Sequence, residues 1–313
     1  MQLLGHSEAE NLLAASDKNR SQSFLLEGQK GIGKYMLAMK HAANVLGNMD
    51  KLVARSHPDF IVIERKYDEK ADKRKKEIVV DDARELGGFL RLTPAESTHR
   101  VAIVDSADEL NTGAANALLK LVEEPPKNSV IILLSHGGHV LPTIRSRCIT
   151  VKLRSLADKE MRQILSQIIP NISDYDMSLL AQISEGSPGV AKEIYDNEGL
   201  WVIGELFEIF EMMPKTEYSK ITKFAERINK SGSGWAIFCH IFEWLTANIA
   251  KSAAKGEALQ LGSSRLMNNV NLPVLLDEIS DWNQICTNTE IYNLDQKQVI
   301  VNKLLKISGA FFA

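Results

Sequence analysis

Short apolar runs of strand length alternate with stretches of helical periodicity over the first half of the chain. The runs are bounded by polar residues and cover 23–27, 60–63, 101–104, 129–134 and 148–153. Segments such as 35–46 and 111–124 lie between them and repeat apolar residues at helical spacing. Strands that alternate with helices are typical of a parallel sheet. The pattern predicts an α/β domain over residues 1–154, with a doubly wound parallel sheet in which 101–104 is a central strand and 148–153 an edge strand.

The second half of the chain continues with helical periodicity and without convincing strand alternation. Residues 155–199 hold three amphipathic segments around a turn at 185–189, which predicts a small three-helix domain. Residues 200–313 predict an all-α domain, whose helices are expected at 201–212, 216–230, 235–255 and 295–307. Its aromatic residues are interpreted as the packing core of these helices.

A strongly charged stretch, residues 65–77, separates two of the predicted strands. We interpret it as a solvated loop, because charge runs usually lie on exposed surface. Its basic cluster, 73–76, is a weaker candidate for contact with nucleic acid. The next segment, 78–84, begins as a strand-like run and is then expected to enter a helix capped by Asp81 or Asp82.

Composition narrows the class of protein. The 313 residues are 44% hydrophobic and 25% charged, as in soluble globular proteins, and the net charge of -3 gives no bulk attraction to nucleic acid. No signal region opens the chain and no run approaches the ~20 apolar residues that cross a bilayer, so we expect a cytoplasmic protein without membrane contact. Three cysteines, far apart in the sequence, favour a reducing compartment. No metal site is expected, and His57 is interpreted as a turn residue.

A glycine-rich segment follows the first predicted strand and opens a helix. Gly28, Gly33 and Lys34 have the spacing of the G-x-x-x-x-G-K phosphate-binding loop, and Gly31 lies within it. In such a loop, backbone N–H groups and the helix N-terminus bind phosphates, and Lys34 would reach the outer ones. The next position is Tyr35, whose phenol cannot replace the short hydroxyl that holds Mg²⁺. The loop therefore predicts either weak ATP binding with poor metal placement or a tight turn kept for packing alone.

Asp105 falls at the carboxyl end of a predicted strand, the edge at which open α/β sheets bind ligands. Together with the glycine-rich loop it makes a candidate nucleotide site, in which the carboxylate would hold Mg²⁺. A working ATPase would also need a glutamate directly afterwards to orient the attacking water. The next residue is Ser106, and Asp108 and Glu109 lie further on. We therefore expect a degenerate site in which hydrolysis is impaired.

Several motifs together resemble the clamp-loader branch of the AAA+ proteins, the loader subunits of bacterial DNA polymerase III. These motifs are Leu4-Gly5-His6, Ser56-His57-Pro58-Asp59, Asn116-Ala117-Leu118-Leu119-Lys120, Glu123-Glu124-Pro125-Pro126, Ser146-Arg147-Cys148 and Gly186-Ser187-Pro188-Gly189. Each motif alone is weak, but their combination is highly specific. The resemblance covers residues 1 to about 200 well and the rest only by helical character and length.

The resemblance implies an AAA+ sheet domain, a small helical lid and a C-terminal helical collar that holds a pentamer together. Motor subunits of such a loader hydrolyse ATP between subunits, and the arginine of the Ser-Arg-Cys motif reaches the neighbour's nucleotide. That role carries over to Arg147. A guanidinium suits it, because it stays charged and its planar fork matches phosphate oxygens.

The resemblance further implies a stator, a subunit that helps to load the sliding clamp onto primed DNA. The implied partners are the gamma/tau motor subunits and the delta subunit, with the sliding clamp and primed DNA reached through the complex. Neither polymerase nor ATPase catalysis is expected of the chain itself.

Departures from the family pattern separate the stator from the motor. Many relatives carry a four-cysteine zinc module before the Asp105 strand, but no cysteine precedes Cys148 here, so no zinc is expected. Active motors also carry a second arginine after a Gly-Ser turn, where this chain has Pro188-Gly189-Val190. With Tyr35, these departures favour the stator. An ATP-hydrolysing motor subunit of the gamma/tau type is the alternative, and a nucleic-acid-binding adaptor is a third reading that the acidic net charge disfavours.

Overall fold

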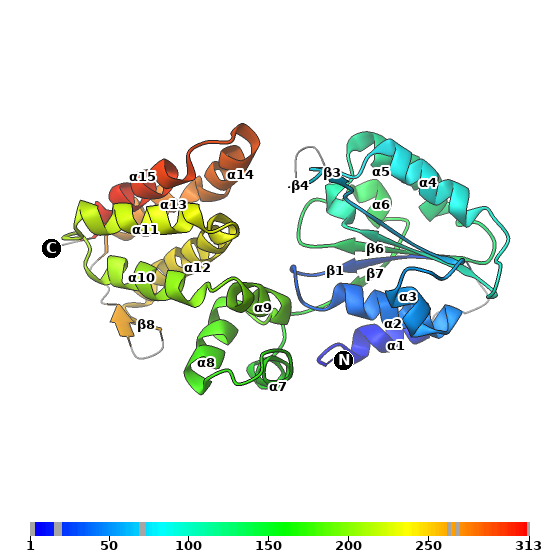
Figure 1. The fold of residues 1–313 in the computed structure, drawn as a ribbon, viewed down its shortest axis with the longest axis horizontal. Helices are drawn as coiled ribbons and strands as arrows, with labels where there is room; N and C mark the ends of the chain where they lie inside the picture. The colour runs from blue at the N-terminus through cyan, green and yellow to red at the C-terminus, as the bar shows by residue number, and fades with distance from the viewer. Residues whose placement is uncertain (1–3, 16–20, 69–72, 262–263, 267–269, 312–313) are drawn as a thin grey trace. The chain divides into compact units, whose positions relative to one another are not determined.

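A computed structural model describes residues 4–15, 21–68, 73–261, 264–266 and 270–311 (Figure 1). The chain divides into two compact units. The first comprises Met1–Ile164 with Glu185–Val190, and the second comprises Leu165–Ser184 with Ala191–Ala313. The division into domains at residues 154 and 199 stays a prediction.

A five-stranded parallel sheet forms the centre of the first unit. Its strands are β1 (Gln22–Glu27), β2 (Phe60–Glu64), β5 (Arg100–Asp105), β6 (Ser129–Ser135) and β7 (Ile149–Lys152). They lie in the order β2-β5-β6-β1-β7. This confirms the parallel sheet, with β5 paired on both sides and β7 at an edge. The apolar residues of β5 and β6 are all buried, because helices cover both faces of the sheet.

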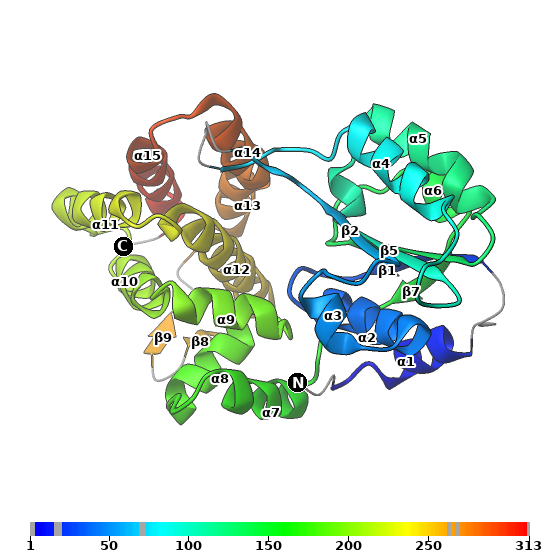
Figure 2. The ribbon, with the colours of Figure 1, turned by 45° about the vertical axis from the view of Figure 1, so that its right-hand side comes forward.

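Helices cover the two faces of this sheet separately, as Figure 2 shows. One face carries α1 (Ser7–Ala14), α2 (Lys34–Leu46) and α3 (Met49–Val53), and the other carries α4 (Val80–Leu90), α5 (Thr112–Glu123) and α6 (Pro142–Arg145). Alternate strand residues divide between the two cores: Phe24 and Leu26 pack toward α2, whereas Leu25 packs with the opposite cluster.

Two expectations between β2 and β5 need correction. Within the charged stretch, β3 (Tyr67–Asp68) pairs antiparallel with β4 (Lys73–Arg74), so part of the expected loop is a short hairpin; residues 69–72 of that expectation lie outside the described residues. The expected strand at residue 78 is only an isolated bridge from Ile78 to Leu110. Helix α4 then begins at Val80, where the carboxylate of Asp82 accepts a hydrogen bond from the backbone N–H of Val79 at 3.0 Å.

The second unit is built mainly from helices. These are α7 (Asp158–Ile168, which begins in the first unit), α8 (Asp174–Ile183), α9 (Pro188–Asp196, which also begins there), α10 (Leu200–Glu211), α11 (Tyr218–Lys230), α12 (Gly234–Lys255), α13 (Leu272–Ser280), α14 (Trp282–Tyr292) and α15 (Gln296–Ser308). The helical prediction is confirmed, with one correction. A short antiparallel hairpin, β8 (Leu259–Leu261) with β9 (Ser264–Leu266), lies in the region where no strand was expected.

Aromatic side chains fill the core of the second unit, as the sequence predicts. Phe238 and Phe242 are completely buried on α12. Trp282 packs against both, and its ring centroid lies 4.5 Å from that of Phe242. Because flat rings present large apolar areas, this cluster joins α12 to α14.

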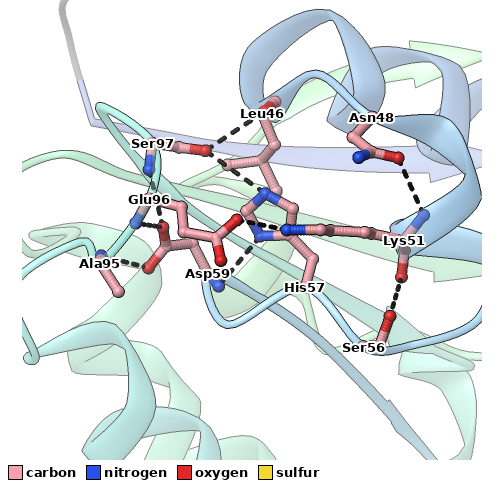
Figure 3. Close-up of polar contacts among 9 residues, drawn as sticks. All are labelled: Leu46, Asn48, Lys51, Ser56, His57, Asp59, Ala95, Glu96 and Ser97. Carbon is pink, nitrogen blue, oxygen red and sulfur yellow. Dashed lines mark hydrogen bonds and ion pairs between the residues drawn. The ribbon is translucent and has the colours of Figure 1, made fainter.

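A buried carboxylate fastens the loop before β5 (Figure 3). Asp59 is completely buried, and its two oxygens accept hydrogen bonds of 2.7, 2.8 and 2.9 Å from the backbone N–H groups of Ala95, Glu96 and Ser97. The guanidinium of Arg100 lies 3.4 Å away. Burial alone would raise the pKa of Asp59, but the three N–H groups and Arg100 together hold the pKa below its usual value.

His57 belongs to the same network and is a turn residue, as predicted. It is buried, and its Nδ1 accepts a hydrogen bond from the backbone N–H of Asp59 at 3.1 Å. The hydroxyl of Ser97, which lies 3.5 Å from Nε2 of His57, also donates to the carbonyl of Leu46. The Ser-His-Pro-Asp motif is therefore structural, since it ties the end of α2 to the loop that leads into β5.

Candidate functional site

The glycine-rich loop joins the end of β1 to the start of α2, as the sequence predicts. Gly31 has φ of 76° and Gly33 has φ of 110°, values in the left-handed region that favours glycine. At Gly28, an added Cβ would lie 2.7 Å from the carbonyl oxygen of Leu153. The three glycines are thus required by the backbone path of the turn.

Lys34 turns back onto its own loop. Its ammonium donates hydrogen bonds to the carbonyl oxygens of Gly28 at 2.7 Å and Gln29 at 2.6 Å, and the residue is 2% exposed. Burial lowers the pKa of Lys34 to about 8, against the opposing negative charges of Asp108 and Asp105. A nucleotide would have to replace these two carbonyl contacts before it could use the lysine.

The turn before α9 packs directly against this loop. The backbone N–H of Gly189 donates to the carbonyl oxygen of Gly31 at 2.9 Å, and the hydroxyl of Ser187 donates to that of Lys30 at 2.7 Å. An added Cβ at Gly189 would lie 2.6 Å from Cα of Gly31. The Gly-Ser-Pro-Gly motif therefore allows the backbone before α9 to pack closely against the backbone of the glycine-rich loop.

Tyr35 is partly buried and packs against the hydrophobic cluster that α2 shares with the sheet. Arg55 has a raised pKa, first because of its hydrogen bond to Glu64 and to a smaller extent because of Tyr35. The ring of Tyr35 thus packs against this cluster, and its phenol lies beside Arg55. That Tyr35 cannot replace a short metal-binding hydroxyl stays a prediction.

Asp105 lies at the carboxyl end of β5, as predicted, and already has a partner. Nε2 of His136 donates a hydrogen bond to Oδ1 of Asp105 at 2.6 Å. The adjacent Asp108 accepts hydrogen bonds from the backbone N–H groups of His136 at 3.0 Å and Gly138 at 2.8 Å. These contacts hold the loop after β6 against Asp105 and Asp108, which together form the acidic edge of the candidate site.

Glu109 completes this acidic edge. Burial raises its pKa, while the nearby guanidinium of Arg65, 2.7 Å from its carboxylate, opposes the shift. Glu109 is therefore engaged in an ion pair, and Ser106 occupies the position directly after Asp105. Within the described residues, no group of three or more His, Cys, Asp or Glu side chains is arranged to hold a metal ion.

Arg147 lies just after α6, on the surface, with a third of its side chain exposed. Its Nε donates to the carboxylate of Glu123 at 2.8 Å, and its Nη1 donates to the carbonyl oxygen of Thr143 at 3.0 Å. The hydrogen bond to Glu123 raises the pKa of Arg147 further. The next residue, Cys148, is half-buried and packs against the hydrophobic cluster that α4, α5 and α6 share with the sheet; burial raises the pKa of its thiol to about 12.

The structure brings most of the predicted nucleotide-site residues together at one edge of the sheet. Asp105 and Asp108 lie close enough to Lys34 for their charges to oppose the lowering of its pKa, whereas Arg147 follows α6 and contacts Glu123 at the end of α5. Sequence reasoning missed His136 and Glu123. A signal existed for His136, because it directly follows the polar end of β6, the strand beside β5.

Comparisons with known proteins find relatives among the subunits of DNA polymerase III. Residues 6–157 match the family model described as DNA polymerase III, delta subunit. The chain is 32% identical over 189 residues to the delta' subunit of DNA polymerase III from Pseudomonas aeruginosa, covering 56% of each chain. It is 38% identical over 122 residues to a gamma/tau subunit from Mycobacterium tuberculosis, covering 37% of this chain and 21% of that subunit.

A solved structure extends the likeness of fold over nearly the whole chain. A DNA polymerase III gamma subunit-related protein from Thermotoga maritima aligns with a TM-score of 0.54 at 20% identity, covering 96% of this chain and 100% of that chain. The parallel sheet with its glycine-rich loop, followed by helices, is an AAA+ fold.

Within that class, the first half of the chain is similar to the delta-prime and gamma/tau subunits of DNA polymerase III. The match spans about half the length of the delta-prime relative and about a fifth of the gamma/tau relative. No helix within the described residues is both long and apolar enough to cross a membrane.

Proposed function

We propose that this chain is the stator of a DNA polymerase III clamp loader, in the manner of a delta-prime subunit. It assembles with gamma/tau motor subunits and a delta subunit, and the complex places a sliding clamp on primed DNA. Arg147 acts in trans on the ATP site of a neighbouring subunit. The chain itself hydrolyses no ATP, and its own loop is a relic of a nucleotide site.

One observation carries this proposal: the groups that would serve a nucleotide within this chain are occupied, whereas Arg147 faces outward. Lys34 is bonded to carbonyls of its own loop, and Asp105 is bonded to His136. Arg147 keeps Nη2 without a partner among the residues that the structure describes. Because a guanidinium holds its charge and offers a fork of donors, it suits a phosphate supplied by a neighbour.

The test is Arg147→Ala in a loader reconstituted from all its subunits. Arg154→Ala is the matched control, since Arg154 is also exposed and its side chain makes no hydrogen bond or ion pair within the described part of the chain. We expect both variants to fold and assemble. DNA-stimulated ATP turnover should fall in the Arg147 variant alone, because an arginine supplied in trans is worth ~10³–10⁵ in rate at the site it serves.

Turnover that is unchanged in the Arg147 variant would rule out the role in trans. The second experiment addresses the alternative, an ATP-hydrolysing motor of the gamma/tau type. Steady Mg²⁺-dependent turnover by the purified chain, abolished by Lys34→Ala, would assign the chain to that class instead.

A further inference from the structure

Two of the sequence motifs, 24 residues apart, meet in the fold through one ion pair. Glu123 is the last residue of α5, and its carboxylate accepts the Nε–H of Arg147 at 2.8 Å. Glu123 belongs to the Glu-Glu-Pro-Pro motif and Arg147 to the Ser-Arg-Cys motif. Pro125, which cannot continue the hydrogen bonding of α5, follows two residues later, so the helix ends where Glu123 can reach Arg147.

The guanidinium of Arg147 is fixed on one side and open on the other. Glu123 takes Nε, and the carbonyl of Thr143, one turn back along α6, takes Nη1. Nη2 has no partner in the described part of the chain. The half-buried neighbour Cys148 packs against the hydrophobic core and so holds the backbone directly beside Arg147. The N–H groups that remain are those of Nη2 and the second one of Nη1. A bidentate contact with two phosphate oxygens can use them.

We propose that Glu123 is a positioning residue for Arg147, holding its guanidinium in the orientation that a phosphate of a neighbouring subunit requires. This inference rests on the proposed function in trans. Glu123 touches no substrate; it acts only through the arginine.

The physical basis is the entropy of a long side chain. An exposed arginine samples many rotamers, and each productive encounter must select one of them. A carboxylate on Nε, together with a carbonyl on Nη1, restricts this sampling before the neighbour arrives. The pair lies in solvent, where ion pairs are weak, so it costs little to adjust when the phosphate binds.

The neighbouring Glu124 supplies the control. It is exposed, belongs to the same motif and makes no side-chain hydrogen bond or ion pair among the described residues. We compare Glu123→Gln, Glu124→Gln, Arg147→Ala and the double variant Glu123→Gln/Arg147→Ala in the reconstituted loader. The measured quantity is Arg147-dependent turnover, the difference in DNA-stimulated kcat between the unaltered loader and the Arg147→Ala loader.

We expect Glu123→Gln to lower Arg147-dependent kcat about two- to tenfold, the range for ordering one flexible side chain, with KM for ATP unchanged. Glu124→Gln should match the unaltered loader. The double variant should equal Arg147→Ala alone, because the effect of Glu123 passes through the arginine.

Two results would overturn this role: a loss in Glu123→Gln that persists in the Arg147→Ala background, or no loss in Glu123→Gln while Arg147→Ala lowers turnover. Failure of the proposed function is a different outcome, since Arg147→Ala itself would then leave turnover unchanged.

Discussion

The carboxylate of Asp105 is hydrogen-bonded to the imidazole of His136, with Oδ1 and Nε2 2.6 Å apart. Asp105 ends β5 and His136 directly follows the neighbouring parallel strand β6, at the edge where a nucleotide and its metal would be bound. A protein side chain therefore engages the oxygen that a Mg²⁺ ion would need. Lys34 is engaged in the same way by carbonyls of its own loop.

We expect the purified chain to bind a fluorescent ATP analogue weakly, with little added affinity from Mg²⁺. His136→Ala should free Asp105 and introduce a Mg²⁺-dependent gain of up to about tenfold, the scale of one lost charge-assisted hydrogen bond. His139→Ala is the matched control, because His139 lies exposed in the same loop and has no partner in the described part of the chain. Equal Mg²⁺ dependence in both variants would show that His136 does not limit the site.

The sheet and its helices were predictable because buried positions recur in the sequence as apolar residues, with a spacing that depends on the type of element. Strands β5 and β6 are apolar between their polar end residues, since each is paired on both sides and covered on both faces. The hairpin of β8 and β9 carried no such signal, because three residues per strand are too few for an alternating pattern.

The contacts within the candidate site were predictable only in part. Gly28, Lys34 and Asp105 have recognisable spacing, so their placement followed from the motif and the strand order. The hydrogen bond from His136 to Asp105 depends on the register between β5 and β6, which local sequence does not carry. The pair of Glu123 with Arg147 depends likewise on how α5 ends beside α6.

Asp59→Asn should lower the free energy of unfolding by about 2–3 kcal/mol, because the amide NH2 group cannot accept the hydrogen bonds that one of the two buried carboxylate oxygens receives from residues 95–97. Urea unfolding of the whole chain measures this. Asp50→Asn, at an exposed position on α3, should stay within about 0.5 kcal/mol of the unaltered protein.

The same carboxylate makes stability depend on pH. The pKa of Asp59 is lowered in the folded chain, so its stabilising contribution is complete above the usual value of 3.8 and is lost as the pH falls through the lower folded value. Unfolding measured across this acid range should therefore show a steeper loss in the unaltered protein than in Asp59→Asn. Parallel curves would mean that another group governs the acid transition.

Gly189→Ala should destabilise the first unit by about 1–3 kcal/mol, since the added methyl group would press on the backbone of Gly31 and neither chain can move away freely. Gly88→Ala provides a control of opposite sign. Gly88 lies inside α4 with no atom near its absent side chain, so alanine there should stabilise by about 0.5–1 kcal/mol. Thermal or urea unfolding distinguishes them, and a neutral Gly189→Ala would contradict the close packing of loop and turn.

Cys239 on α12 and Cys286 on α14 are free thiols whose sulfur atoms lie 3.0 Å apart. Oxidised glutathione should convert them to an intramolecular disulfide: one thiolate attacks the glutathione disulfide, the other displaces the second glutathione, and two reduced glutathione molecules leave. The hydrogen bond between the thiols, followed by burial, raises the pKa of Cys239, so closure should be slow at neutral pH and faster in alkali.

Peptide mapping by mass spectrometry should find the link between Cys239 and Cys286 and none involving Cys148. Cys148 has no second cysteine within its own unit and burial raises its pKa to about 12, so its reaction would stop at a mixed disulfide if it occurs at all. Cys286→Ser removes the resolving thiol and should leave Cys239 reduced or singly glutathionylated. Separate glutathione adducts on Cys239 and Cys286 in the unaltered chain would show that α12 and α14 do not hold the two sulfurs together in solution.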